Sequence, residues 1–212
     1  MPNLPISGLP QATTLDGTEL FAVVQGGITK YVTAQNLNYI TSNNYGLFNQ
    51  TGASIPITNT TSELTLLDGG VGTLTVPANG FSVGDAFHAV ATGHLDAINN
   101  NNLRIRIKSG AVILVDTGNI TMAGATNRHW KLEIYFSINA IGGAGVANVS
   151  TAGTFLYTKD AGSEFQGVNF STENNTTFNT LISNILDVTA QWDSADTGNS
   201  IYSQIFTLNK TY

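Results

Sequence analysis

The segment "LDVTAQWDSADTGNSIYSQIFTLNKTY", residues 186–212, decides the fold class because its apolar residues recur at every second position. The apolar residues of its first half are Leu186, Val188, Ala190 and Trp192, and an apolar pattern resumes over residues 201–208. A period of two is typical of half-buried β-strands. The segment therefore predicts two strands joined by a loop, and this loop contains Asp193 and Asp196.

The same pattern of short strands continues over most of the chain. From about Ile55 onward, turn-rich pieces separate the candidate strands SIPITNT, ELTLLD, GTLTVP, DAFHAVATG, LRIRIKS, AVILVDTG, HWKLEIYFSINAIG, GTFLYTK, FQGVNFS, LDVTAQW and SIYSQIFTL. Short strands at such spacing indicate an all-β antiparallel sandwich. One piece, TTFNTLISNIL, has apolar residues at helical spacing, but its Thr and Asn content favours a loop with at most one helical turn.

Residues 1–40 are predicted to be a separate anchoring segment. ELFAVVQ and ITKYVTA flank Gly26 and Gly27, which is the pattern of a β-hairpin with a two-residue turn. Thr33 is placed to cap a short helix in AQNLNYI. A hairpin with one short helix is marginal alone in water, so we expect it to dock on another surface. The polar residues 41–54 are predicted to be a linker, and residues 55–212 the sandwich domain.

The composition limits the classes of partner. Only 10% of the 212 residues are Asp, Glu, Lys or Arg, and the formal net charge is −6. Nucleic-acid binding needs clustered basic residues, and the one local cluster, LRIRIKSG, alternates along a predicted strand as a solvated or inter-subunit face would. No apolar run approaches the roughly 18 residues that span a membrane, and no signal-peptide pattern opens the sequence. We expect no nucleic-acid partner, no membrane insertion and no export.

Catalytic and metal-binding chemistry finds few candidates. The chain has no cysteine, which excludes cysteine nucleophiles and zinc–thiolate sites. The histidines that could serve as the base beside another nucleophile are His88, His94 and His129. None lies in a recognisable motif, and their spacing does not indicate a metal site, although His88 and His94 are close in the chain. The glycine-rich pieces DGGVGTL and IGGAGVANV lack the context of phosphate-binding loops. We predict no catalytic residue, no metal and no cofactor.

Asp193 and Asp196 leave three alternatives, namely a metal site, a catalytic pair and a solvated turn. The stretch WDSADTGNSIY has no further acidic residue for a calcium loop, and a short connection between adjacent strands offers no cleft for a glycosidase pair. We interpret it as a turn in which the carboxylates accept local backbone hydrogen bonds and Gly198 adopts a positive φ.

Aromatic residues in the predicted strands are candidates for the core, for a subunit interface or for stacking on a sugar. The four candidates for interface or glycan contact are Trp130, Tyr135, Trp192 and Tyr202.

Two parts of the sequence resemble virion proteins. The segment ISGLPQATTLDGTELFAVVQGGITKYVTAQNL is similar to an N-terminal segment of virion-associated proteins of tailed phages and some large DNA viruses, where it precedes fibre or decoration domains. The pieces VGDAFHAVATGHL, LRIRIKSGAVILVDTG, HWKLEIYFSINAIGGAG and LDVTAQWDSADTGNSIYSQIFTL resemble the jelly-roll domain at the ends of such proteins, which is similar in outline to tumour-necrosis-factor and complement-type heads.

The resemblance implies a non-enzymatic structural subunit of a virion, of the head-fibre or tail-fibre type. It implies a homotrimer formed through the jelly-roll head and attachment to other virion proteins through residues 1–40. Two alternatives come from other classes of function. One is a carbohydrate- or receptor-binding module at a fibre tip that contacts a host surface glycan, and the other is a capsule-degrading enzyme, which usually needs a cleft with paired carboxylates.

Overall fold

The computed structural model describes residues 20–33 and 47–212. The chain divides into two compact units, residues 1–44 and residues 45–212. In the first unit, β1 (Leu20–Gln25) and β2 (Ile28–Thr33) pair antiparallel. Gly26 and Gly27 have φ angles of 62° and 75°, a left-handed backbone that glycine adopts at little cost and that two-residue hairpin turns require. The predicted hairpin is confirmed, whereas the predicted helix after Thr33 lies outside the described residues.

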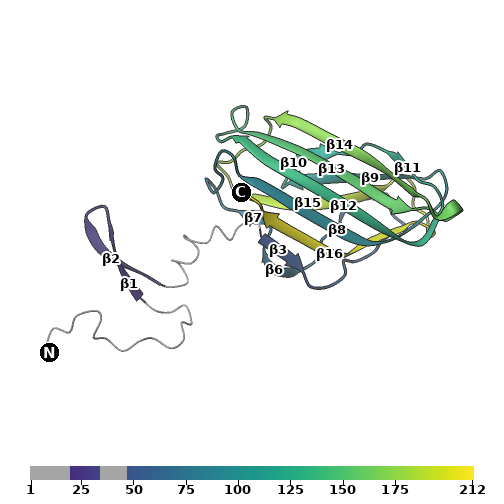
Figure 1. Ribbon diagram of the computed structural model, residues 1–212, viewed down its shortest axis with the longest axis horizontal. Coiled ribbons are helices and arrows are strands. Elements are labelled where there is room, and N and C mark those ends of the chain that lie inside the picture. Colours follow the sequence, from purple (N-terminus) through teal and green to yellow (C-terminus); the bar gives the residue numbers. More distant parts are fainter. Residues whose placement is uncertain (1–19, 34–46) are drawn as a thin grey trace. The chain divides into compact units, whose positions relative to one another are not determined.

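The second unit is a sandwich of two antiparallel sheets, which confirms the predicted all-β fold (Figure 1). The large sheet has the order β14-β13-β12-β8-β16-β3-β6, and β4 also pairs with β16. Its strands are β3 (Leu47–Gln50), β4 (Ile57–Thr58), β6 (Gly70–Thr73), β8 (Ala86–Ala97), β12 (Ala125–Ala140), β13 (Asn148–Thr158), β14 (Phe165–Asn175) and β16 (Ser200–Lys210).

The small sheet has the order β10-β9-β15-β5, with β11 paired to β9 and β7 paired to β15. Its strands are β5 (Leu64–Thr65), β7 (Thr75–Val76), β9 (Asn102–Ser109), β10 (Val112–Asp116), β11 (Ile120–Thr121) and β15 (Asn184–Trp192). The 3-10 turn η2 (Ala161–Ser163) is the one helical element among the described residues. No helix in the described part of the chain is long and apolar enough to cross a membrane.

One hydrophobic core lies between the two sheets. Along β8 the exposure alternates residue by residue over the whole strand, as expected for a strand with one face on a core. Side chains from both sheets belong to a single cluster, which includes Phe87, Leu95, Ile105, Ile107, Trp130, Leu132, Val188, Trp192 and Phe206. The period-two pattern of residues 186–192 therefore arises, as predicted, from a strand with one face on the core.

The structure differs from the predicted linker over residues 41–54. β3 lies inside that range and pairs with β16, with Phe48 opposite Leu208 and Asn49 opposite Thr207. Phe48 is 9% exposed, and its ring lies 6.1 Å from that of Phe206. The sandwich therefore includes Leu47–Gln50, ahead of the predicted start at Ile55. The sequence did not indicate this strand because it has only four residues and polar residues flank it on both sides.

Two other segments show how local turns modify the predicted strands. The piece GTLTVP, predicted as one strand, divides into β6 on the large sheet and β7 on the small sheet. The piece TTFNTLISNIL contains no helix and runs as turns into β15, which confirms the predicted loop. Its Phe178 is buried against Phe81, with ring centroids 5.4 Å apart.

Candidate functional site

The two outer faces of the sandwich differ in charge. On the small sheet, the basic residues of LRIRIKSG project outward from β9 and are paired within the chain. Arg106 Nη1 lies 2.7 Å from Glu63 Oε2, Lys108 Nζ lies 3.1 Å from Glu63 Oε1, and Arg104 Nε donates to Asp116 Oδ1 at 2.8 Å. This face is a network of ion pairs, so its basic groups are already neutralised by neighbouring carboxylates.

The carboxylates in this network are held in their charged form. Burial by itself raises the pKa of Asp116, but hydrogen bonds from Arg104, the Gly118 N–H and Arg106 outweigh it and leave the pKa below its ordinary value. Burial likewise raises the pKa of Glu63, while hydrogen bonds from Thr189 and Lys108 bring the net shift downward. The network therefore stays ionised at neutral pH.

The outer surface of β14, β13, β12, β8 and β16, which we call the large-sheet face, carries few charges. Its residues lie in register in rows across the strands. Four of these rows are Tyr202–His94–His129, Ile205–Thr92–Lys131–Leu156, Thr207–Val90–Glu133–Thr154 and Asn209–His88–Tyr135–Ala152. Within these rows Lys131 and Glu133 are the residues with a formal charge, and they pair with each other at 2.8 Å.

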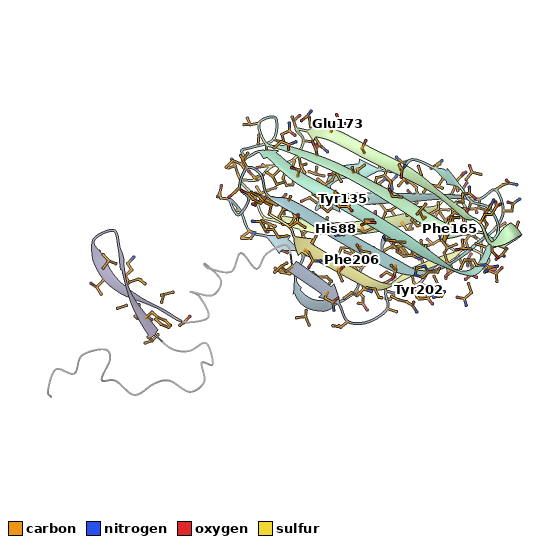
Figure 2. All side chains as sticks on the ribbon, in the orientation of Figure 1. His88, Tyr135, Phe165, Glu173, Tyr202 and Phe206 are labelled. Atoms are coloured by element: carbon orange, nitrogen blue, oxygen red, sulfur yellow. The ribbon has the colours of Figure 1, made fainter. Side chains whose placement is uncertain are left out.

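Glu133 forms the centre of one polar cluster on this face. Tyr135 Oη donates to Glu133 Oε1 at 2.8 Å, and His88 Nε2 lies 2.9 Å from the same oxygen. The His88 and Tyr135 rings stack with centroids 4.7 Å apart. Figure 2 labels both residues on the large sheet. Hydrogen bonds from Lys131, Tyr135 and His88, in that order, lower the pKa of Glu133 to about 2. The bond to Glu133 also raises the pKa of the Tyr135 phenol.

His94 forms the centre of a second cluster, nearer the other end of the strands. Its ring stacks on Tyr202 at 6.2 Å and meets the ring of His129 edge-on at 6.0 Å. His94 Nδ1 lies 3.4 Å from the carbonyl oxygen of Asn127. The sheet thus brings together two histidines that are 35 positions apart in the sequence.

The structure separates the four predicted aromatic candidates into two groups. Trp130 and Trp192 are fully buried at 0% exposure, so the expectation that they contact a partner chain or a glycan is wrong. The Trp192 indole N–H donates to Ile57 O at 3.1 Å, and the Trp130 indole N–H lies 3.2 Å from the carbonyls of His94 and Tyr202. Tyr135 is 53% exposed and Tyr202 is half-buried, and both lie on the large-sheet face.

Hydrogen bonds to both carboxylates hold the loop with Asp193 and Asp196; the bond to Asp196 is local, as predicted, whereas the bonds to Asp193 come from β9. Asp193 accepts from the Asn102 backbone N–H at 2.9 Å and from Asn102 Nδ2 at 2.7 Å, while Asp196 Oδ1 accepts from the Gly198 N–H at 2.9 Å. The expectation of a positive φ at Gly198 is wrong, because the side-chain bond from Asp196 closes the turn without it. Among the described residues no group of three or more His, Cys, Asp or Glu side chains is placed to hold a metal ion.

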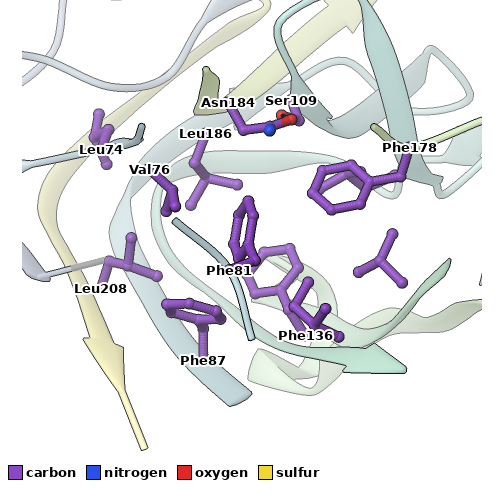
Figure 3. A pocket seen from close by; sticks show the side chains of 13 residues that line it. Leu74, Val76, Phe81, Phe87, Ser109, Phe136, Phe178, Asn184, Leu186 and Leu208 are labelled. Carbon is purple, nitrogen blue, oxygen red and sulfur yellow. Dashed lines mark hydrogen bonds between the residues drawn. The ribbon is translucent and has the colours of Figure 1, made fainter. Parts of the chain in front are cut away.

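A small apolar cavity of about 50 Å³ lies between the sheets (Figure 3). Its lining includes Phe81, Phe87, Phe136 and Phe178, with one polar pair formed by Ser109 and Asn184. Ser109 Oγ donates to Asn184 Oδ1 at 2.8 Å, and Asn184 Nδ2 donates to the carbonyls of Asn179 and Ile182. The polar atoms are thus satisfied inside the chain, and the cavity is a small gap in the core packing.

The chain matches no family model, no curated protein and no solved structure. On its geometry, the large-sheet face is the strongest candidate for a functional site. The sequence did not indicate the pairing of His94 with His129, because the two residues are 35 positions apart in the chain. The available signal was the strand register, since His129 lies in the predicted strand HWKLEIYFSINAIG and His94 directly follows the predicted strand DAFHAVATG.

Proposed function

We propose that this chain is a non-enzymatic virion structural protein, a surface, fibre or decoration subunit that forms a homotrimer through its sandwich. The observation that carries the proposal is the contrast between the two outer faces. Surface strands that carry few charges are poorly protected against association, whereas the ion-pair network of the small sheet suits contact with water. The large-sheet face is thus the surface that a second and a third copy of the chain cover.

The order of the strands supports a jelly-roll interpretation of the sandwich. The chain places β8 in the large sheet, β9 and β10 in the small sheet, β12 to β14 in the large sheet, β15 in the small sheet and β16 in the large sheet. Repeated crossing between two antiparallel sheets is the connectivity of jelly-roll domains. This is the fold that the resemblance to virion heads implies.

The large-sheet face is broad enough for a stable interface. Five strands about 4.8 Å apart and four rows about 6.8 Å apart give a flat area of roughly 650 Å². Each partner in a standard protein interface buries about 800 Å², so the face with its side-chain relief approaches one standard contact, and the second contact that each chain makes in a cyclic trimer includes residues beside this face. Copies of one face arranged about a threefold axis form a closed ring, which limits assembly to a defined oligomer.

The hairpin of the first unit supports the anchoring role proposed for residues 1–40. Large apolar side chains of β1 and β2 are exposed, with Val24 at 74%, Ile28 at 63% and Tyr31 at 73%. An isolated two-stranded hairpin is marginally stable in water, and contact with another virion protein would cover these residues. The proposed location of the protein is therefore the virion.

The trimer is tested by measuring the mass of the whole chain in solution. Light scattering coupled to gel filtration at micromolar concentration is expected to give about three times the chain mass of 22.4 kDa. A mass of 22.4 kDa under these conditions would refute the proposed assembly.

A glycan-binding fibre tip is the second candidate, and exposed Tyr135 favours it. An aromatic ring on a flat sheet face can stack on a sugar, and this ring is held in place by Glu133. The two functions require different states of the same residue, because Tyr135 is covered in the trimer but free in a glycan-binding face. Binding to a glycan array that is lost in Tyr135→Ala would favour the second function.

A further inference from the structure

The three histidines of the chain all project from the large-sheet face, and two of them are direct neighbours across strands. His129 on β12 is the register partner of His94 on β8. Their ring centroids are 6.0 Å apart, with the ring planes at 86°. Two imidazole nitrogens bound to one ion at metal–nitrogen distances of about 2.0 to 2.1 Å lie about 3 to 4 Å apart. A small side-chain rotation therefore suffices to bring both rings onto one ion.

The contacts of His94 leave one ring nitrogen available. Its Nδ1 faces the carbonyl oxygen of Asn127 at 3.4 Å, and a carbonyl only accepts hydrogen bonds, so Nδ1 carries the proton in this contact. Nε2 then keeps its lone pair. Stacking on Tyr202 at an interplanar angle of 18° further restricts the ring. Histidines that bind metals commonly donate their second N–H to a carbonyl or carboxylate, and His94 already has this arrangement.

A β-bulge supplies the carbonyl that orients His94. The register between β12 and β8 breaks between Ala125 and Arg128, and Asn127 adopts a φ of 48°, in the left-handed region. Its N–H donates to Asp96 Oδ1 at 2.7 Å, so Asn127 is held through both its N–H and its carbonyl. Bulges occur often beside functional sites because they redirect backbone and side chains. Asn adopts the left-handed region more readily than most residues, and this conformation places the Asn127 carbonyl beside His94.

His129 is the more adaptable member of the pair. Its side chain is exposed on β12, and its ring makes no hydrogen bond within residues 20–33 and 47–212, the part of the chain that the structure describes. It therefore has both nitrogens free and is able to turn toward His94. The oriented His94 and the exposed His129 together provide two imidazole nitrogen donors.

We propose that His94 and His129 form a cross-strand binding site for one late first-row divalent cation, with Cu²⁺ bound more tightly than Ni²⁺ or Zn²⁺. Imidazole donors suit these ions, and the affinity of such a site rises to Cu²⁺ along the Irving–Williams order. Mg²⁺ and Ca²⁺ require several oxygen ligands and do not fit two imidazoles. His94 and His129 lie in the first of the four rows, at the edge of the surface that the proposed trimer covers, so the ion and the water that completes its coordination still reach the site.

The test is a titration of the full chain, freed of metal with EDTA and then dialysed, with CuCl₂, NiCl₂, ZnCl₂ and MgCl₂ in a calorimeter. We expect one Cu²⁺ per chain, weaker binding of Ni²⁺ and Zn²⁺, and no binding of Mg²⁺. His129→Gln removes an exposed ligand and is expected to weaken Cu²⁺ binding by at least about tenfold. Mutation of a residue that only supports a metal ligand already weakens metal binding about tenfold or more, so loss of the ligand itself should have at least that effect. His94→Gln is expected to have the same effect.

His88→Gln is the matched control, because it removes a histidine of the same face that contacts Glu133 instead of another histidine. It is expected to bind Cu²⁺ like the wild type, and the electron paramagnetic resonance spectrum should still show nitrogen ligands. Equal loss of binding in His88→Gln, or unchanged binding in His129→Gln with a cooperative melting curve, would overturn the assignment.

Discussion

A chain that begins at residue 54 is expected to be much less stable than a chain that begins at residue 45. The longer chain keeps the whole second unit, whereas the shorter one loses β3. Burial of Phe48 contributes about 1.5 to 3 kcal/mol, and its pairing with the Phe206 ring adds about 0.5 to 1.5 kcal/mol.

Gln50 adds a second contribution to the same difference. Its Nε2 donates to Ser203 Oγ at 3.0 Å, and its Oε1 accepts from the Asp68 N–H at 3.2 Å. Each of these bonds is worth about 1 kcal/mol. The expected loss in the free energy of unfolding is therefore about 4 to 6.5 kcal/mol, a large part of the stability of a typical domain.

Urea unfolding followed by circular dichroism, at equal protein concentrations, measures this difference. Phe48→Ala in the chain that begins at residue 45 is the matched control, with an expected loss of about 3 kcal/mol. Equal midpoints for the two chains would show that β3 does not belong to the sandwich, and this part of the account would then be wrong.

Two further predictions concern the core and the large-sheet face. Trp192→Ala is expected to lower the free energy of unfolding by about 3 to 5 kcal/mol because the side chain is fully buried. Tyr202→Ala is expected to lower it by under about 1.5 kcal/mol. Equal losses in urea unfolding would contradict the assignment of Trp192 to the core. Glu133 has its pKa lowered from 4.5 to about 2, so its charged form stabilises the fold above pH 4.5, and this stability is lost as the pH falls toward 2. The difference in stability between the wild type and Glu133→Gln should therefore shrink over that range in acid titrations, and parallel curves would refute the assigned contacts.

Much of the fold was predictable because it follows from local pattern. Long strands such as β8 bury every second residue, so their alternation in the sequence identifies them directly. The hairpin at Gly26 and Gly27 was predictable for a similar reason, since its turn requires glycine. β3 has only four residues in a polar setting, and its place is fixed by pairing with β16, more than 150 positions away. Such pairing leaves no periodic signal.

The candidate site was less predictable, because it depends on which strands become neighbours. Alternation placed Trp192 in a strand but did not say which sheet face was buried, and the structure assigns the residue to the core. His94 and His129 each lie at an outward position, yet their contact exists only because β8 and β12 pair in one particular register. Asp196 was the simpler case, since its bond from the Gly198 N–H lies within a turn that the loop composition already indicated, whereas the partner of Asp193 is Asn102 on β9.

We propose that the large-sheet face joins copies of this chain, and a pair of matched variants tests this assembly. Ile205 on the large-sheet face and Ile113 on the outer face of the small sheet are 53% and 44% exposed. Each is replaced by Arg, and the mass in solution is measured by light scattering. Ile205→Arg is predicted to give a single chain of 22.4 kDa, while Ile113→Arg keeps about three times that mass. The same mass for both variants would contradict the claim.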